Sequence, residues 1–300
     1  MKKGLEIYFS MPFFKRKDTM KHLKKTKRNR HHKNNLLRPV LFLICCVGFL
    51  ICARNYFSVL LAEGKADRAY SAVRDLARQE AEEKAAPVSV PAGNPEAESP
   101  EIPAAASGRD SFSVDIRGLQ KEYPELSAWL RSEGAGIDYP VMHTKDNEYY
   151  LTRLYDGTEN VSGSLFADYR NTGILTDANT VIYGHNMKNG GMFHPVEEYK
   201  SQDFYDANPT MRICTAEGDY VIELIGGTVE SGDEEFVWFG FDGFEDMKAY
   251  VDSIRARSTF ESGVELQPGD RLVSLCTCNY DKWNARYMLV GRVPGTAFSG

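Results

Sequence analysis

Cysteine is scarce in this sequence: its 300 residues include six, and three of them lie together in an apolar stretch (Cys45, Cys46 and Cys52). The rest of the chain contains only Cys214, Cys276 and Cys278. Three cysteines cannot all pair, so this part is not a disulfide framework of the small secreted kind. The sequence also has no CxxC, no HExxH, no Gly-rich phosphate loop and no internal repeat. These absences exclude the common redox, zinc-protease and nucleotide-binding signatures and leave at least one free thiol to explain.

Positive charge is concentrated at the N-terminus. Residues 1–38 contain thirteen Lys and Arg against two acidic residues, a net charge of +11. Because the whole chain carries −6, residues 39–300 carry −17. A basic tail directly before an apolar stretch is typical of a membrane-orientation signal. An arm that binds nucleic acid is the weaker interpretation, and we expect no nucleic-acid partner.

The apolar stretch after the basic tail is nearly long enough to cross a bilayer. Residues 40–53 are free of charge, and residues 36–53 give 18 residues if Arg38 extends toward the headgroups. Since about 20 residues are needed, the span is expected to extend into residues 55–62, with Arg54 near the far interface. The sequence therefore predicts an uncleaved single-pass anchor in the cell membrane, with a cytoplasmic N-terminus and an extracellular globular domain. A cleaved signal peptide is the alternative, although Ala62-Glu63-Gly64 is a poor cleavage site.

The composition divides the chain into four segments. We expect a basic cytoplasmic tail (1–35), a transmembrane anchor (36–62), a helical stalk with a Pro/Ala-rich linker (63–110) and a globular catalytic domain (111–300). Residues 63–86 are helix-prone and charged, with few residues for a core, which predicts a solvated stalk. Residues 87–110 contain five prolines and predict an extended spacer. Together these segments are expected to hold the domain away from the bilayer.

The globular part contains several short β-like runs separated by Gly, Asn, Asp and Pro clusters. These runs are IDYPVMH, SGSLFADY, NTVIYGHN, MRICTA, DYVIELIGGTVE, DRLVSLCTC and ARYMLVGRV. The pattern predicts a mainly antiparallel barrel or sandwich. Helices are expected in YPELSAWLRSEG, in HPVEEYKSQDFYDANP and in DGFEDMKAYVDSIRARS, where Phe244, Met247, Tyr250, Val251 and Ile254 share a face.

The cysteine pair lies at the end of one predicted strand. DRLVSLCTC alternates, so Cys276 and Cys278 share a face, and the turn-rich NYDKWN ends the strand near Cys278. A thiol at a strand end is exposed enough to react, whereas a mid-strand thiol is usually a buried small hydrophobe. Cys278 is therefore the best candidate nucleophile, ahead of Cys276 and then Cys214.

A reactive thiol needs a basic or cationic neighbour, because at its ordinary pKa of about 8.5 little of it is ionised at neutral pH. The candidates are His143, His185 and His194. His185 is favoured because it follows an apolar β-run, whereas His194 precedes a proline at a predicted helix start, where a capping or surface role is expected.

Arg286 opens the β-run that follows the cysteine pair, eight residues after Cys278. A hairpin between the two runs would place Arg286 beside Cys278, where a guanidinium stabilises a developing oxyanion. The alternative role for Arg286 is a surface salt bridge with Asp281.

With these residues in hand, the chain resembles the class B sortases from about residue 115 to residue 293. The motifs occur in the family's order: IDYPVMHTKDNEYYL, GSLFADYRN, NTVIYGHNMKNGGMF, the helix within DGFEDMKAYVDSIRARS, SLCTC and ARYMLVGRV. The resemblance implies a mainly β fold, an eight-stranded sortase-type barrel with peripheral helices, preceded by a transmembrane helix and stalk. Matched residue by residue, it implies Cys278 as nucleophile, His185 as acid and base, and Arg286 as the oxyanion-stabilising residue.

The same resemblance implies a cysteine transpeptidase without cofactor or metal. Its substrates would be surface proteins with a C-terminal sorting signal, cleaved at a Thr–Gly or Thr–Asn bond through a thioacyl intermediate. The acceptor would be an amine of peptidoglycan precursor or of a pilin, a pilin-polymerising sortase being the alternative within the family. Ser274, Thr277 and Tyr280, in or beside the cysteine strand, are the expected substrate contacts.

The sequence departs from the family pattern beside the nucleophile. Cys276 stands where the family motif has serine, and the residues after Cys278 are Asn279-Tyr280-Asp281 instead of an early acid. Cys276 either fills space or captures a sulfenic acid on Cys278. A metal-binding module that uses Cys276, Cys278 and His185, or a catalytically inactive cell-surface module on the same fold, are the interpretations from other functional classes.

Overall fold

The computed structural model describes residues 30–85, 114–233, 235–279 and 284–298. The chain divides into two compact units, Met1–Ser58 and Val59–Gly300. Helix α1 (Arg30–Ala85) runs without interruption for 56 residues, and its part from Val59 onward belongs to the second unit. In the ranges described, one helical stretch, Leu37–Arg78, is long and apolar enough to cross a membrane. The predicted spacer, 87–110, lies outside the described residues.

The strands of the second unit close into an eight-stranded barrel, as the family resemblance implies, in the order β1-β2-β3-β4-β7-β8-β6-β5. Their bounds are β1 (Leu126–Ser132), β2 (Ile137–His143), β3 (Leu165–Ala167), β4 (Asn179–Tyr183), β5 (Thr210–Thr215), β6 (Asp219–Ser231), β7 (Arg271–Asn279) and β8 (Ala285–Val293). Two pairs are parallel, β2 with β3 and β4 with β7, and the others are antiparallel. Closure leaves no free sheet edge, which holds the register of every strand.

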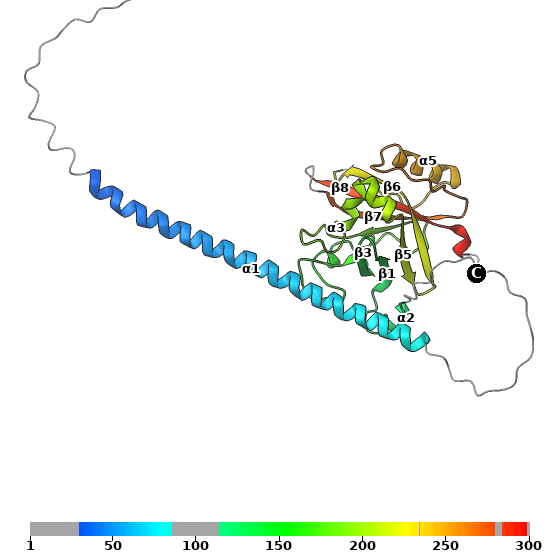
Figure 1. Ribbon diagram of the computed structural model, residues 1–300, viewed down its shortest axis with the longest axis horizontal. Coiled ribbons are helices and arrows are strands. Elements are labelled where there is room, and N and C mark those ends of the chain that lie inside the picture. The colour runs from blue at the N-terminus through cyan, green and yellow to red at the C-terminus, as the bar shows by residue number, and fades with distance from the viewer. Residues whose placement is uncertain (1–29, 86–113, 234, 280–283, 299–300) are drawn as a thin grey trace, which may run out of the picture. The chain divides into compact units, whose positions relative to one another are not determined.

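Short helices lie between the strands. They are α2 (Ile116–Leu119), η1 (Tyr149–Leu151), α3 (His194–Glu197), η2 (Glu198–Lys200), α4 (Gln202–Ala207), α5 (Phe244–Arg255) and η3 (Gly295–Phe298). The two helical stretches expected after residue 190 are therefore confirmed, the first as three short pieces. Helix α5 packs against β6 on the outside of the barrel (Figure 1). Its buried residues are Met247, Val251 and Ile254, which belong to the predicted apolar face.

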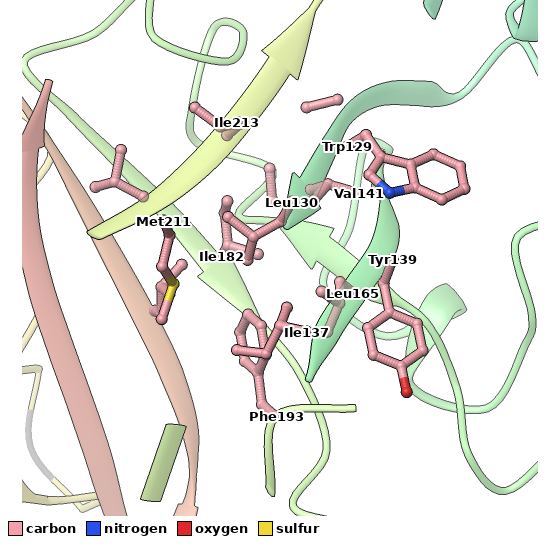
Figure 2. Close-up of a cluster of buried hydrophobic side chains, with 14 of the residues drawn as sticks. Trp129, Leu130, Ile137, Tyr139, Val141, Leu165, Ile182, Phe193, Met211 and Ile213 are labelled. Atoms are coloured by element: carbon pink, nitrogen blue, oxygen red, sulfur yellow. The ribbon is translucent and has the colours of Figure 1, made fainter. Parts of the chain in front are cut away.

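The main core fills the barrel and extends to the buried side of α1, and further clusters lie outside the barrel. Leu275 of β7 and Leu289 of β8 belong to the main core, part of which is drawn in Figure 2. Cys276 and Met288, one residue along on each strand, belong to a separate cluster that includes Ile254 of α5. The alternation predicted for the cysteine strand is thus present. One face of β7 fills the barrel and the other faces α5 and the loop before it.

The helix predicted for residues 123–134 is wrong, because this segment contains strand β1. Leu126, Trp129 and Leu130 are fully buried, and β1 pairs with β2 on one side and β5 on the other. Its Leu, Ala and Arg residues favour a helix in isolation, but pairing on both edges outweighs that preference. Gly136 has φ +71 and turns the chain into β2 instead of ending a helix.

The expectation that residues 63–86 are solvated on all sides is also wrong. One side of this part of α1 is buried in the main core of the second unit, through Ala66, Tyr70, Val73 and Ala77. The spacing of four, three and four residues is a helical stripe, and its small alanines are poor core signals in sequence although they permit close packing. The Tyr70 hydroxyl donates to Gly163 O at 2.6 Å, so the helix is fixed to the barrel by polar contacts as well.

Candidate active site

Three strands bring the predicted reactive residues to one end of the barrel. Strand β7 pairs with β8 so that Cys278 lies opposite Arg286, as the predicted hairpin requires. Strand β4 runs parallel to β7 with Tyr183 opposite Cys276, and Gly184 N donates to Cys276 O at 3.1 Å. His185 thus follows the Tyr183–Cys276 pair by two residues along the chain after β4, and Cys278 follows it by two residues along β7. The side chain of Cys278 lies outside the described part of the structure.

The ring and the main-chain carbonyl of His185 are both hydrogen-bonded. Its Nε2 lies 2.7 Å from Leu151 O, and since a carbonyl oxygen only accepts, this nitrogen carries a hydrogen. Its own carbonyl accepts from Phe193 N at 2.8 Å. A Cβ on Gly184 would lie 2.4 Å from Leu165 and 2.7 Å from Phe193 side-chain atoms, so only glycine fits directly before the histidine. The YGH sequence is thus fixed in place by packing and hydrogen bonds.

A cavity of about 220 Å³ lies at this end of the barrel. The residues that line it include Leu151, Tyr183, His185, Cys276, Thr277 and Arg286. The side chains of His185 and Arg286, two of the three predicted catalytic residues, therefore line one pocket. The third, Cys278, lies opposite Arg286 on β7. Arg286 is half-buried, and its Nη1 donates to Ala285 O at 3.1 Å.

The other two histidines of the globular part lie elsewhere. His194 begins α3, where its Nδ1 lies 2.8 Å from Asn186 Oδ1 and its Nε2 lies 3.7 Å from Glu198. This is the helix-start role that the sequence predicts for it. His143 ends β2, and its Nε2 is buried without a hydrogen-bond partner among the described residues. Neither residue lines the pocket that contains His185.

The two described thiols of the barrel unit are buried. Cys276 is 1% exposed, and burial raises the pKa of its thiol far above the ordinary value. Cys214 is equally buried, and burial and then Asp219 raise its pKa as well. A thiol that stays protonated is a poor nucleophile. This observation agrees with the predicted ranking, in which Cys278 comes before both.

The expected substrate contacts have different positions. Thr277 lines the pocket, and its hydroxyl donates to Gly184 O at 2.9 Å, directly before His185. Ser274 is fully buried and donates to Asn179 Oδ1 at 3.1 Å, so its hydroxyl joins β7 to β4 and does not reach the pocket. Burial of this polar group requires that bond and explains why a serine is tolerated there. Tyr280 lies outside the described residues.

A buried carboxylate behind the pocket was missed by the sequence reasoning. Asp168 follows β3 and accepts hydrogen bonds from Asn147 Nδ2, Tyr183 OH and Arg170 Nη2, each at 3.0 Å. Burial opposes its ionisation, but the hydrogen bonds from Arg170 and Asn147 outweigh this, and the pKa of Asp168 lies below its ordinary value. Tyr183 has a raised pKa, chiefly because it is buried. The FADYRN motif carries the signal for this cluster.

Arg170 extends the same cluster to the loop before α5. Its Nη1 lies 2.5 Å from Glu235 Oε1, and its guanidinium lies 4.3 Å from the centre of the Phe239 ring. The loop after β3 is therefore tied to the loop between β6 and α5, which covers the outer face of β7. No sequence spacing predicts such a contact, because its partners are 65 residues apart.

Comparisons with known proteins agree with this fold. The chain is 35% identical over 168 residues to sortase B of Listeria monocytogenes, which covers 56% of this chain and 68% of the relative. The crystal structure of Clostridium perfringens sortase B has a TM-score of 0.56 and 31% identity, covering 59% of this chain and 98% of that one. A sortase B–substrate complex of Staphylococcus aureus has a TM-score of 0.56 and 25% identity, covering 60% and 84%. No protein-family model matches the chain.

The eight-stranded closed barrel matches solved sortase structures, and the similarity to sortases supports a cysteine transpeptidase. The extent of the identity to the Listeria relative settles the subgroup: the chain belongs to the sortase B family.

Proposed function

We propose that this sortase is anchored in the cell membrane, cleaves the C-terminal sorting signal of surface proteins and joins the new carboxyl end to a cell-wall amine. The observation that carries the proposal is the strand register that sets Cys278 opposite Arg286, with His185 and Arg286 lining one pocket. The Staphylococcus aureus structure with substrate supports a peptide substrate for this barrel.

In the first half-reaction, Cys278 acts as a thiolate and His185 as an imidazolium. The sulfur attacks the carbonyl carbon of the threonine before the scissile bond, and the carbonyl oxygen becomes an oxyanion. Arg286 stabilises this oxyanion, since its guanidinium is always charged and presents several donors. His185 then gives its proton to the leaving nitrogen, the C–N bond breaks, and a thioester remains.

In the second half-reaction, an amine attacks the thioester. Neutral His185 takes the proton from the attacking nitrogen, the C–S bond breaks, and Cys278 leaves as a thiolate. Because Nε2 of His185 donates to Leu151 O, the proton exchanged with substrate is the one on Nδ1. Leu151 and Thr277 thereby position the histidine from opposite sides, one through its ring and one through the preceding carbonyl.

The proposed topology follows from charge. The thirteen positive residues before the apolar stretch keep the N-terminus in the cytoplasm and the barrel outside. A membrane-impermeant thiol reagent on wall-stripped cells should label cysteines introduced at residues 87–110 but not at residues 1–35. The reverse labelling pattern would overturn the orientation.

The catalytic assignment is tested with peptides that contain a Thr–Gly or Thr–Asn bond and with triglycine as the acceptor. Cys278→Ala should abolish cleavage, while Cys276→Ser, which keeps a small side chain at a neighbouring position, should retain it. His185→Ala and Arg286→Ala should each lose about 100-fold or more in rate.

Arg286→Lys separates charge from geometry. Lysine keeps the charge but not the planar fork, so we expect only partial recovery. Cleavage by Cys278→Ala at a rate comparable with the natural protein would remove the nucleophile assignment. Full activity in Arg286→Lys would reduce the role of Arg286 to its charge.

A further inference from the structure

Three hydrogen bonds connect the end of the apolar stretch of α1 to the histidine of the pocket. Ala62 O accepts from Asn160 Nδ2 at 2.8 Å, and Asn160 N donates to Thr152 O at 2.9 Å. The carbonyl of the preceding residue, Leu151, is the partner of His185 Nε2. The turn of α1 at residues 59–62 and the pocket are therefore joined through one loop, residues 152–160.

This part of α1 is a fixed element of the barrel unit. Tyr155 OH donates to Ala69 O at 3.1 Å, and Arg74 Nε donates to Asp138 O at 3.0 Å. Asn160 is 7% exposed, and both polar atoms of its side chain are hydrogen-bonded: Nδ2 donates to Ala62 O and Oδ1 accepts from Ser162 N. A buried, hydrogen-bonded amide of this kind holds its two partners at a defined separation.

The part of α1 from Val59 onward is docked on the barrel within one unit. Residues 86–113 connect two parts of this unit, because the helix before them and the strands after them already pack together. The unit that contains the barrel therefore begins at Val59, near the end of the apolar stretch.

Counting residues places Ala62 at the membrane surface. Twenty residues from Leu36 reach Asn55, which is about the length that crosses the hydrocarbon core. The six residues from Tyr56 to Leu61 then rise about 9 Å at 1.5 Å each, similar to the thickness of one headgroup layer. Tyr56 and Phe57 are aromatic residues of the type enriched at this level.

Exposed apolar side chains of the barrel unit belong to the segments next to the hydrogen bond between Asn160 and Ala62. Nine large hydrophobic residues of the described part of this unit are exposed, and six of them belong to the helix turn, to η1 or to the loop between them. We call five of these the apolar rim: Leu60, Leu61, Tyr149, Leu151 and Val161, with exposed fractions of 43, 67, 39, 39 and 50%. The other exposed residues, such as Val221 on β6, are scattered singly, which is ordinary for a soluble surface.

The polar groups at the rim suit a headgroup layer. The Arg153 guanidinium lies 4.6 Å from the centre of the Tyr149 ring and pairs with Glu159 at 3.2 Å. An aromatic ring with a polar tip beside a long cation is the combination found where one end of a side chain is apolar and the other wet. Because the pair is neutral, the attraction to lipid would come from apolar burial and not from anionic headgroups.

We propose that the apolar rim rests in the headgroup layer of the bilayer that the chain's own helix crosses. The pocket with His185 then opens beside the membrane surface, within reach of an acceptor carried on a lipid. This inference rests on the proposed membrane anchor, and its partner is the lipid surface itself. It replaces the picture of a catalytic domain held away from the membrane by a spacer.

The first test measures depth in the full chain, reconstituted in phosphatidylcholine vesicles. A small fluorescent amino acid is placed at Val161, or at Val221 as the matched exposed valine at the other end of the barrel, or at Phe49 in the apolar stretch. A nitroxide near the lipid headgroup should quench Val161 about threefold more than Val221. A nitroxide deep in the acyl chains should quench Phe49.

The outcomes separate the anchor from the rim. Quenching at Phe49 with equal, weak quenching at Val161 and Val221 would overturn the rim while keeping the anchor. The absence of quenching at Phe49 would overturn both, since no bilayer would then be crossed.

The second test uses two acceptors, triglycine in solution and glycyl-phosphatidylethanolamine in vesicles. Val161→Asp should lower transfer to the lipid acceptor about fivefold while peptide cleavage and transfer to triglycine stay unchanged. Val221→Asp should leave all three unchanged. Equal rates for the two variants on the lipid acceptor would overturn the proposal. A loss of transfer by Val161→Asp on both acceptors would overturn it as well. Absence of peptide cleavage in the natural protein would overturn the proposed function instead.

Discussion

Asp168→Asn is the substitution that most directly tests the buried cluster behind the pocket. The natural carboxylate is fully buried and accepts hydrogen bonds from Asn147, Tyr183 and Arg170. The asparagine side chain has the same shape, but its NH2 group replaces one of the two accepting oxygens of the carboxylate. The hydrogen bond that Arg170 or Asn147 donates to that oxygen is therefore lost. A hydrogen bond to a charged group is worth about 1.5–3 kcal/mol, and breaking a buried ion pair costs about 3–5 kcal/mol.

The lower end of that range applies here. The Arg170 side chain is 37% exposed and keeps a second carboxylate, that of Glu235, so its charge is not stranded. We therefore expect a loss of about 3 kcal/mol in the free energy of unfolding at pH 7. For a unit of this size this corresponds to a fall in Tm of about 6–12 °C. The assay is thermal unfolding of the full chain in detergent, followed by near-ultraviolet circular dichroism.

The pH dependence gives the same experiment a second readout. The pKa of Asp168 is lower in the folded protein than in the unfolded chain, where it is about 3.9. Its contribution to stability is therefore complete above that value and is lost as the pH falls through the folded pKa. The difference in Tm between the natural protein and Asp168→Asn should be constant from pH 7 to about pH 5 and shrink below about pH 4.

A matched control makes the result specific. Asp252→Asn removes an exposed carboxylate that pairs with Lys248 on α5, and it should leave the Tm unchanged. If Asp168→Asn unfolded within about 1 °C of the natural protein at pH 7, the carboxylate would not be the buried partner that the geometry describes. An unchanged difference between pH 5 and pH 3 would refute the linkage argument even if the loss at pH 7 were found.

Two further substitutions probe the cysteine strand. Thr277→Val removes the hydrogen bond to Gly184 O and should lower the rate of peptide cleavage about tenfold with little change in KM. Thr277→Ser keeps the hydroxyl and should restore most of the rate. An equal loss of rate in both variants would indicate a packing role for Thr277 instead. Cys276→Ser treated with peroxide and then with dithiothreitol should recover activity as fully as the natural protein does. In the natural protein the Cys276 thiol is buried and protonated, so it condenses only slowly with a sulfenic acid on Cys278, a reaction that would release water. Markedly poorer recovery in Cys276→Ser would restore the redox role.

The sequence predicted the strands at the site well because their signals are local. The alternation in β7 and the turn-rich residues after it are sufficient to place Cys278 near a strand end and Arg286 on the next strand. The register of one hairpin then brings the two residues opposite each other, as found. The position of His185 after an apolar run was equally visible. What these residues share is a partner that is close in sequence or fixed by a simple strand geometry.

The features that were missed depend on distant partners. Strand β1 is built from good helix formers and is a strand only because β2 and β5 flank it. The buried side of α1 is made partly of Ala66 and Ala77, whose burial requires a barrel surface about 90 residues away in sequence to approach closely. Asp168 reads as an ordinary loop acid until Arg170 and Tyr183 are folded around it. Tertiary contact decides each of these cases, and local preference does not.

The position of Arg286 opposite Cys278 depends on the strand register, which the barrel interior helps to fix. A slip of one residue between β7 and β8 would leave Cys278 in place and turn Arg286 to the opposite face. Such a slip is opposed from inside, because Leu275 lies opposite Leu289 and Thr277 opposite Tyr287, all of them buried. Moving β8 by one residue would exchange Leu289 and Tyr287 of the main core with Met288 and Val290 of the second cluster, so both cores would have to repack. The packing of these side chains therefore fixes which residue of β8 lies opposite Cys278.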